Sequence, residues 1–444
     1  MRASFIHIAD THLGYEQYGV RERFNDFSRT FWRIAEDARQ REVDFVLIAG
    51  DLFNKRAIDA QTLLHATEGL RRLKEHNIPV LAIEGNHDRS YYRDGISWLQ
   101  FLCHEGFITL LTPIMRDGVP QITPWQPQNM LGAYVDLVGG RLRVYGLPWQ
   151  GAATTRSMEG MAQALTVARA EEDAEGIEYR VLMMHTGVEG IVARVQGLPA
   201  MTHFQPLHTC VDYLALGHVH KPYEFDGWMY NPGSPETCGA EEAQWDRGYY
   251  YVQVDTDEPE RIIDPLRKER VHHAEHIKSK RRPFVRHDLR VDALTDPEDL
   301  YARLEDYCRR ESAPSQDPEE QPVVLIQLVG TLGFDAGALD QPRMEEMVRN
   351  YFQALYVRID NNTNDQDYAP DDGELDGRDR SLWHELERRI FEELVARDSR
   401  YLPAKEQWSA LLAELKQRAL QQDAPEHIAQ LLRDKRAELP GSNN

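Results

Sequence analysis

Histidine side chains that could bind a metal ion occur close together in the segment LALGHVHKP, residues 214–222. His218 and His220 lie two positions apart, directly after an apolar run typical of a buried strand. Imidazole nitrogens are common ligands of Zn, Fe and Mn, although a surface turn can also contain two histidines. The pair alone does not separate these possibilities, because a metal site needs further ligands from elsewhere in the chain.

Aspartate, asparagine and histidine follow four other apolar runs in the same way. They are Asp10 and His12 after SFIHIA, Asp51 after DFVLIAG, Asn86, His87 and Asp88 after PVLAIEG, and His185 at the end of YRVLMMH. Ligands of open α/β sheets bind outside the carboxyl ends of the strands, so five strands would direct these side chains into one crevice. Each motif is weak evidence by itself, but together they predict a metal centre.

The types of ligand narrow the predicted chemistry. Carboxylate, amide and imidazole groups without a thiolate suit Mn, Fe or Zn rather than a cysteine-rich structural zinc site. Asp51 is the natural bridge between two cations, which would lie roughly 3.5–4 Å apart and generate the nucleophile for an in-line displacement. With Asp10, Asp51 and a bridging hydroxide, two divalent cations keep a net charge of about +1, which would attract a phosphodiester anion.

His87 is next to a predicted ligand and is the candidate catalytic residue. We expect it to donate a proton or a hydrogen bond to the leaving oxygen, where negative charge develops. The alternative is a histidine that only orients a neighbouring ligand. Asp88 is expected to orient a neighbour or to cap the segment that follows.

Short strands separated by amphipathic helices must position these residues. The expected strands cover residues 4–9, 44–50, 79–85, 141–148, 179–185, 211–217 and 248–254. Between the first three strands, residues 24–41 and 60–76 carry apolar side chains at helical spacing. Buried strands joined by helices predict an α/β domain in which helices cover the sheet.

Three further regions are predicted after this domain, which we place at residues 1–278. Residues 279–360 are expected to alternate strands and helices as a small α+β domain. Residues 361–380 contain few apolar side chains and are expected to form an acidic linker, because such a segment cannot bury enough surface to fold. Residues 381–444 carry apolar spacing typical of a helical tail.

The composition limits the class of protein. A chain of 444 residues exceeds the usual size of one hydrophobic core. It has no signal-like start and no apolar run of roughly 20 residues, and its four scattered cysteines lack metal or redox spacing, so we expect a cytoplasmic protein. The net charge of −22 argues against nucleic-acid binding by the whole surface, but not against a local site.

The order D-x-H, GD, GNHD, a strand-ending His and GHxH resembles the calcineurin-like metallophosphoesterases, which hydrolyse phosphate esters with two metal ions. The segments ADTHLGYEQYG, IPVLAIEGNHD, VDYLALGHVHKP and YNPGSPE are similar, more narrowly, to the SbcD-type nucleases of the meiotic-recombination-eleven family. The resemblance covers about residues 1–255 and is weaker over 283–360. It implies a four-layer α/β/β/α sandwich, a capping domain at 279–360, and a nuclease subunit that processes DNA ends in double-strand-break repair.

Carried over by motif, the resemblance implies two divalent metal ions per subunit, with Mn²⁺ as the favoured identity. One ion would be held by Asp10, His12, Asp51 and His220, and the other by Asp51, Asn86, His185 and His218. His87 would be the catalytic histidine. The residue after GDLF is Asn54, where many members of the family have a second histidine, so the balance between exonuclease and endonuclease activity stays open.

The resemblance also implies partners: DNA, a second copy of the chain in a homodimer, and an SMC-like ATPase of the SbcC type bound through the C-terminal helices. The apolar residues of the tail to test for this contact are Trp383, Leu386, Ile390, Phe391, Trp408, Leu412 and Leu415. The alternative is a helical subdomain that packs only on itself. DNA contacts outside the metals are expected from Tyr15, Gln17 and Arg23, and from the basic stretch 261–290, which could equally be a solvated face.

Two other functions stay open at this point. A metallophosphoesterase acting on a small phosphodiester, a nucleotide or a phosphoprotein would share all of these motifs, since fold does not determine substrate. The regions after residue 280 would be superfluous in such an enzyme, which favours the DNA nuclease. The third hypothesis is a scaffold with purely structural metal ions, and His87 argues against it because a structural site needs no proton donor.

Overall fold

The computed structural model describes residues 1–90, 95–193, 197–257, 271–292, 294–365, 390–395, 401–420 and 425–438. The chain divides into two compact units. The first consists of Met1–His287, Glu305–Ile326 and Pro342–Ile359, and the second of Asp288–Leu304, Gln327–Gln341 and Asp360–Asn444. All of the predicted metal ligands belong to the first unit.

The first unit contains two six-stranded sheets. In one of them the strand order is β14-β13-β1-β2-β3-β4, and β1 to β4 run parallel. Strands β13 and β14 extend this sheet in antiparallel pairing. The strands comprise Arg2–Ile8 (β1), Phe45–Ile48 (β2), Val80–Ala82 (β3), Thr109–Leu110 (β4), Gly248–Asp255 (β13) and His272–Lys278 (β14).

The second sheet has the order β11-β12-β10-β9-β8-β7. Its four central strands run parallel, and the edge strands β7 and β11 are antiparallel to their neighbours. The strands comprise Tyr134–Leu137 (β7), Leu142–Leu147 (β8), Tyr179–Met184 (β9), Tyr213–Leu216 (β10), Tyr223–Phe225 (β11) and Met229–Asn231 (β12). A separate hairpin pairs β5 (Met115–Arg116) with β6 (Val119–Pro120).

Both faces of each sheet are buried. Successive residues of a strand point to opposite sides, so they contribute in turn to the core between the sheets and to the core under the helices. On β1, Phe5 belongs to the core between the two sheets, whereas Ile6 and Ile8 pack on the opposite face against α1. Helices α1 (Arg21–Gln40) and α2 (Ala60–Glu75) cover that outer face, and α3 (Trp98–His104) adds to the same core. Helices α4 (Thr154–Glu175) and α5 (Gln205–His208) cover the outer face of the second sheet.

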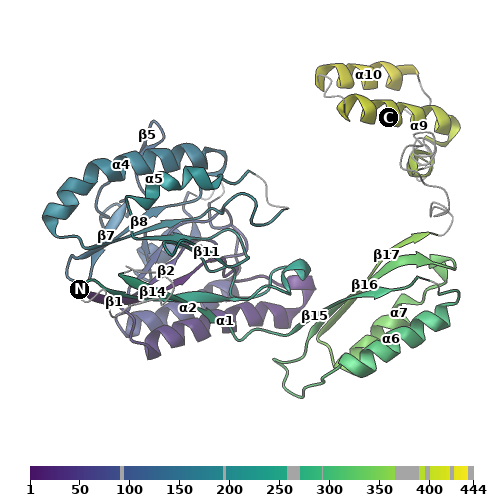
Figure 1. Cartoon of the computed structure of the whole chain (residues 1–444), viewed down its shortest axis with the longest axis horizontal. Helices are drawn as coiled ribbons and strands as arrows, with labels where there is room; N and C mark the ends of the chain where they lie inside the picture. The colour runs from purple at the N-terminus through teal and green to yellow at the C-terminus, as the bar shows by residue number, and fades with distance from the viewer. Residues whose placement is uncertain are drawn as a thin grey trace. The chain divides into compact units, whose positions relative to one another are not determined.

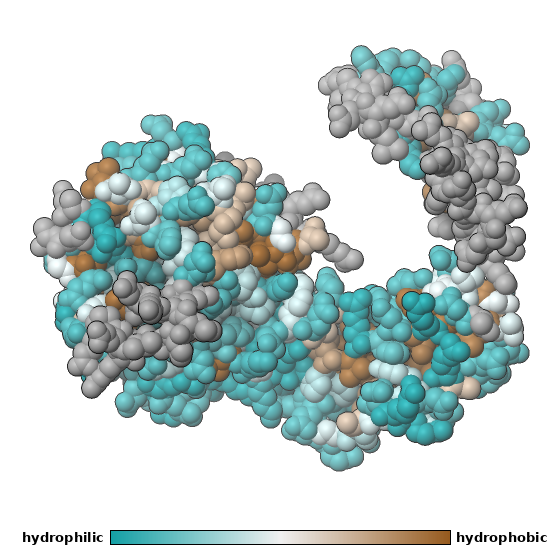
Figure 2. Space-filling view, in the orientation of Figure 1, coloured by the Kyte–Doolittle hydropathy of each residue, from teal (hydrophilic) through white to brown (hydrophobic). Residues whose placement is uncertain are grey.

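The first unit therefore has four layers, with helices outside two packed sheets (Figure 1). This confirms the predicted α/β/β/α sandwich. The expected strands and helices of this unit all form, whereas helices α3, α4 and α5 and strands β4 to β7, β11, β12 and β14 were not predicted. Hydrophilic residues predominate on the face that Figure 2 shows, as the net charge of −22 leads one to expect.

His7 is a polar residue buried in the first sheet. Its Nε2 lies 3.0 Å from the carbonyl oxygen of Leu216, and its Nδ1 lies 3.0 Å from the hydroxyl of Tyr213. Because a carbonyl oxygen can only accept, Nε2 carries the proton and Nδ1 accepts from Tyr213. Burial lowers the pKa of His7 to about 3, so its ring is neutral at neutral pH.

We expect His7 to make the free energy of unfolding depend on pH. The unfolded chain protonates His7 as the pH falls through about 6.5, whereas the folded protein does so only near its lowered pKa of about 3, so stability decreases between these values. Between about pH 7.5 and pH 5 the loss from this group is about 2 kcal/mol. Urea unfolding in EDTA should show a loss that is smaller in His7→Gln, which cannot titrate. Equal losses in the two proteins would contradict this assignment.

Residues 284–365 contain a three-stranded sheet of order β15-β16-β17. Its strands are Phe284–Arg290 (β15), Val323–Leu332 (β16) and Tyr356–Asp365 (β17), and the helices between them are α6 (Pro297–Glu311) and α7 (Gln341–Phe352). Strand β17 continues to Asp365, past residue 361 where the acidic linker was expected to begin, since a strand can present polar side chains to solvent. Residues 366–380 of the predicted linker lie outside the described residues, and the predicted domain boundaries stay a prediction.

The described part of the C-terminal tail includes helices α9 (Lys405–Leu420) and α10 (Pro425–Glu438), and residues 390–395 are also helical. Trp408 is buried there in a small apolar cluster against which Leu412 and Leu415 pack. Ile390 is exposed, and Trp383 and Leu386 lie outside the described residues. Part of the predicted contact set thus stabilises the tail itself, while ATPase binding stays a prediction. None of the described helices is long and apolar enough to span a membrane.

Candidate metal centre

The loops after β1 and β2 are held in register by backbone hydrogen bonds that continue beyond the strands. The amide of Asp10 donates to the carbonyl oxygen of Gly50 over 3.1 Å, and that of His12 donates to the carbonyl oxygen of Asp51 over 3.2 Å. Asp10, His12, Asp51 and His218 all have positive φ, from 46° to 83°. Such a conformation is costly outside glycine, so its occurrence at four predicted ligands is typical of a functional site.

The loops after β9 and β10 bring histidines from the second sheet to these residues. Gly217 permits this approach, because a Cβ atom there would lie 2.3 Å from the carbonyl oxygen of Ala49 in the first sheet. The amide of His218 donates to both carboxylate oxygens of Asp10, over 3.2 and 2.9 Å. The predicted ligands therefore come together from both sheets.

Asp51 belongs to two groups of potential ligands. One contains His12 and His87, and the other contains His185 and His218. Within each group, one ligand atom from every residue lies within 4.8 Å of the others. A carboxylate common to two such groups is the arrangement expected of a ligand that bridges two cations.

Asn86 completes the second of these groups. Its Oδ1 lies 3.1 Å from Nε2 of His185 and 2.9 Å from Nδ1 of His218, and Nε2 of His185 lies 3.3 Å from Oδ2 of Asp51. Nδ1 of His185 is 2.8 Å from the carbonyl oxygen of Ala49, so Nδ1 carries the proton and Nε2 is available as a ligand atom. The donor set of carboxylate, amide and imidazole fits a divalent cation.

On the other side, the rings of His12 and His220 approach each other with Nε2 atoms 3.0 Å apart. Nε2 of His220 lies 4.0 Å from Oδ1 of Asp10. Nδ1 of His220 donates to Oε1 of Glu242 over 2.7 Å. Neither Glu242 nor the nearby Cys238 was predicted from the sequence, which offers no motif that links them to His220.

Burial strongly affects the charges of these residues. It raises the pKa of Asp10 to about 6 despite the neighbouring histidines. Burial also acts to raise the pKa of Asp51, but the His185 charge beside it lowers that pKa below the usual range. For His185, burial acts to lower the pKa, and Asp51 raises it to about 9. Ionisable groups buried this close together need a compensating charge, which a divalent cation would provide.

His87 lies at the edge of this cluster and is half-buried. Its Nδ1 is 2.7 Å from the carbonyl oxygen of Asn54, so Nδ1 carries a proton and the ring is held by the backbone of that residue. Asn54 lines an open pocket of about 470 Å³ together with Lys55, Arg56, Ala57, Asn86 and His87. The carboxylate of Asp88 accepts from the amides of Phe53 and Gly85, over 3.1 and 3.0 Å, and thus joins the β2 and β3 loops as expected of an orienting residue.

The DNA contacts predicted for Gln17 and Arg23 are wrong, because both side chains are completely buried. The guanidinium of Arg23 donates to Gln17, to Asp26 over 2.6 Å and to Glu236 over 3.2 Å. These internal bonds use its charge to join α1 to the segment after β12. Tyr15 is half-buried against Phe27, and its DNA contact stays a prediction. Of the basic stretch 261–290, residues 261–270 lie outside the described residues.

We expect Glu242→Gln to weaken metal binding without removing a ligand. The carboxylate fixes the tautomer and orientation of His220, and losing such a partner typically costs about 10–100-fold in metal affinity. Calorimetric titration of the metal-free protein would measure this change. Glu241→Gln, which alters the adjacent residue, serves as the control, and equal affinities in the two variants would contradict the role of Glu242.

Comparison with known proteins agrees with this geometry. Residues 3–222 match the family described as calcineurin-like phosphoesterase. The protein named DNA double-strand break repair protein Mre11 from Archaeoglobus fulgidus is 34% identical over 248 residues, which are 54% of this chain and 51% of the relative. Proteins of the same name are 31% identical in Haloferax volcanii (57% of this chain, 49% of the relative) and 30% identical in Aeropyrum pernix (59% and 60%).

The chain thus spans about half the length of the relatives it matches. The matched region contains β1 to β3, β9 and β10, together with every predicted metal ligand and His87. These residues converge in the four-layer sandwich as the predicted metal centre requires. Residues 3–222 of the chain therefore form a domain of the calcineurin-like phosphoesterase family.

Proposed function

We propose that this chain is a two-metal-dependent DNA nuclease with exonuclease and endonuclease activity, which processes DNA ends in double-strand-break repair. The observation that carries the proposal is Asp51, a buried carboxylate common to two groups of candidate ligands beside His87. The DNA substrate is supported by relatives named as DNA double-strand break repair proteins. Neither observation favours a small phosphoester as the substrate.

The proposed ligand sets follow from the contacts described above. Asp51, Asn86, His185 and His218 would hold one cation, and Asp10, His12, Asp51 and His220 the other. Bound divalent cations, for which we propose Mn²⁺, would supply an activated water and neutralise charge on the phosphodiester. Lys55 and Arg56 line the pocket beside His87 and would attract the phosphates of the DNA backbone.

His87 is suited to act on the leaving oxygen. Since the carbonyl of Asn54 accepts from Nδ1, Nε2 of a protonated ring can donate to the oxygen on which charge develops. The ring is held by a backbone atom of Asn54, so this orientation does not require a histidine at that position. The proposed role of His87 is therefore compatible with an asparagine at position 54, where many members of the family have a histidine.

We expect His87→Ala to lower DNA hydrolysis by about 10²–10⁴-fold, the usual contribution of a positioned acid or base. Metal content should change little, because His87 is in neither proposed ligand set and its backbone amide, which donates to Oδ1 of Asp51 over 2.9 Å, is kept in the variant. The measurement compares cleavage of linear duplex DNA, circular single-stranded DNA and a chromogenic phosphodiester in Mn²⁺, Mg²⁺ and EDTA. His104→Ala, at an exposed position of α3, is the matched control.

Two outcomes of this assay would overturn parts of the proposal. Turnover of the small ester with both DNA substrates intact would favour a metallophosphoesterase that acts on a small phosphodiester. Full DNA cleavage by His87→Ala would contradict the role of His87 while leaving the nuclease in place.

We further propose an SMC-like ATPase partner of the SbcC type, bound through the C-terminal helices, and a homodimer. Ile390, Leu394 and Leu432 are exposed apolar residues in the described part of the tail, and they are the residues to test for contact with a partner. Support for both partners comes from the resemblance alone.

A further inference from the structure

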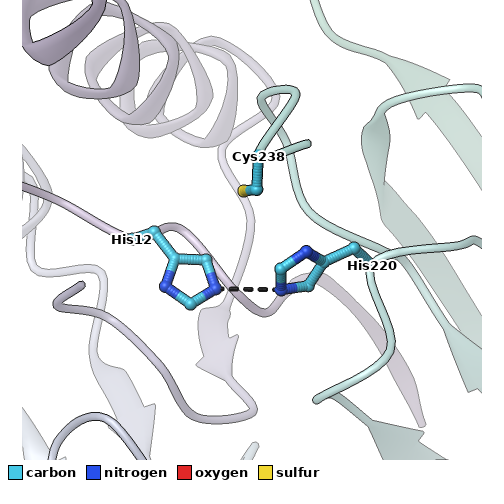
Figure 3. A group of neighbouring side chains, drawn as sticks. All are labelled: His12, His220 and Cys238. Carbon is cyan, nitrogen blue, oxygen red and sulfur yellow. Dashed lines mark hydrogen bonds between the residues drawn. The ribbon is translucent and has the colours of Figure 1, made fainter. Parts of the chain in front are cut away.

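Cys238 lies beside the ring nitrogens of His12 and His220 (Figure 3). Its Sγ atom and one nitrogen from each ring all lie within 4.8 Å of one another. His12 follows β1, His220 follows β10 and Cys238 follows β12, so three separate loops meet at this point. Cys238 is half-buried and forms no disulfide.

The hydrogen bonds of the two rings point to a missing positive charge between them. Since Glu242 accepts from Nδ1 of His220, Nε2 of His220 faces Nε2 of His12 across 3.0 Å, and a proton or a metal cation must lie between these two atoms. His12 is only 3% exposed, and its Nδ1 has no hydrogen-bond partner. With both rings neutral, a proton on Nδ1 of His12 would leave two lone pairs face to face, and a proton on its Nε2 would leave Nδ1 as a buried acceptor without a partner. A cation between the two Nε2 atoms would accept both lone pairs.

A thiolate at this position would complete a recognisable ligand set. Two imidazoles and one thiolate bind Zn²⁺ at about 2.0–2.1 Å for nitrogen and about 2.3 Å for sulfur. The backbone amide of Cys238 donates over 3.0 Å to Oε2 of Glu242, the same carboxylate that orients His220. One buried glutamate therefore positions both the thiol and the imidazole.

We propose that Cys238 is a thiolate ligand of the cation bound by His12 and His220, and that it makes this position prefer thiophilic ions such as Zn²⁺ over Mn²⁺. Binding would release the thiol proton to solvent as the sulfur–metal bond forms. Soft thiolate ligands select zinc-like ions, whereas the Asp51, His185 and His218 group offers only oxygen and nitrogen atoms. The inference rests on the proposed metal centre and adds that its two positions differ in metal preference.

The first test uses Co²⁺ as a spectroscopic probe of the metal-free protein. The wild-type protein should develop a thiolate-to-cobalt charge-transfer band in the near ultraviolet, and Cys238→Ser should lack it. Cys210→Ser is the matched control, because the Sγ atom of Cys210 contacts the carbonyl oxygen of Pro206 over 3.4 Å and the hydroxyl of Thr166 over 3.5 Å, and a serine hydroxyl can make the same contacts. A band that persists in Cys238→Ser, or one absent from the wild-type protein, would overturn the proposal.

The second test needs no variant and therefore does not depend on its folding. Alkylation of Cys238 in the wild-type chain, followed by mass spectrometry, should slow by about tenfold or more when Zn²⁺ is bound, as expected for loss of a free thiol. An unchanged rate would contradict ligation. In Cys238→Ser, the affinity for Zn²⁺ should fall by about tenfold or more while that for Mn²⁺ changes less.

DNA cleavage by the wild-type protein, measured in parallel, separates this proposal from the proposed nuclease function. Cleavage without a thiolate band would disprove the role of Cys238 and leave the nuclease in place. A thiolate band without cleavage of any DNA substrate would support the ligand assignment and disprove the proposed substrate.

Discussion

Asp51→Asn is expected to abolish metal-dependent hydrolysis. The change removes the one negative charge that both groups of candidate ligands contain, and an amide is a poor bridge between two cations. Loss of several kcal/mol of transition-state stabilisation corresponds to a decrease in kcat/KM of about 10³-fold or more. Because the residue is 2% exposed, solvent cannot replace its charge.

Metal content by mass spectrometry and hydrolysis of linear duplex DNA would be measured together for Asp51→Asn. Asp59→Asn is the matched control, since Asp59 caps α2 with its side chain and asparagine caps a helix equally well. The variant should bind fewer ions than the control and should still fold in EDTA. Activity within tenfold of the control would show that Asp51 is not shared by two functional cations.

Gly85→Ala should damage the same site without changing any ligand. A Cβ atom at Gly85 would lie 2.0 Å from Oδ1 and 2.5 Å from the backbone nitrogen of Asp51, far inside contact distance. Either the β3 loop that carries Asn86 and His87 or the β2 loop that carries Asp51 must therefore move. We expect a loss of stability of about 1–3 kcal/mol, as for other overpacking changes, and a large loss of metal affinity.

Thermal unfolding and calorimetric metal titration would test this expectation. Gly139→Ala is the control, because a Cβ there meets nothing within 4 Å even though φ is +66°. The control should lose only about 1 kcal/mol through its backbone conformation and keep its metal affinity. A Gly85→Ala protein with the affinity of this control would show that the spacing of the two loops does not determine the metal centre.

The sequence by itself determined where the strands lie and which residues follow them. Buried parallel strands are short apolar runs, and the predicted ligands after β1, β2, β3, β9 and β10 end these runs with polar side chains. Asp51, His185 and His218 were predicted in this way and lie in one group. The strands and the position of these residues could be predicted because both are local properties of the chain, whereas metal binding by these residues stays a prediction.

Only the tertiary structure showed how these strands are divided between the two sheets. An apolar run does not specify which other strand it pairs with. The motifs by themselves could therefore not show that Asp51 follows a strand of one sheet and His185 a strand of the other. Arg23 illustrates the same limit, because its predicted contact with DNA failed once the fold enclosed its charge among Asp26 and Glu236. The solvent exposure of a side chain depends on which segments pack against it, and the neighbouring residues in the sequence do not specify those segments.

Glu242 and Cys238 could also be identified as part of the candidate metal centre only from the tertiary structure. Glu242 is 22 positions from His220, and no spacing rule links a glutamate or a lone cysteine to a histidine that far along the chain. Their roles arise because the segment after β12 folds back over the loop after β10. The residues that can hold the metals were therefore local features of the sequence, whereas the groups that orient and tune them depend on long-range packing, which brings together side chains from distant segments.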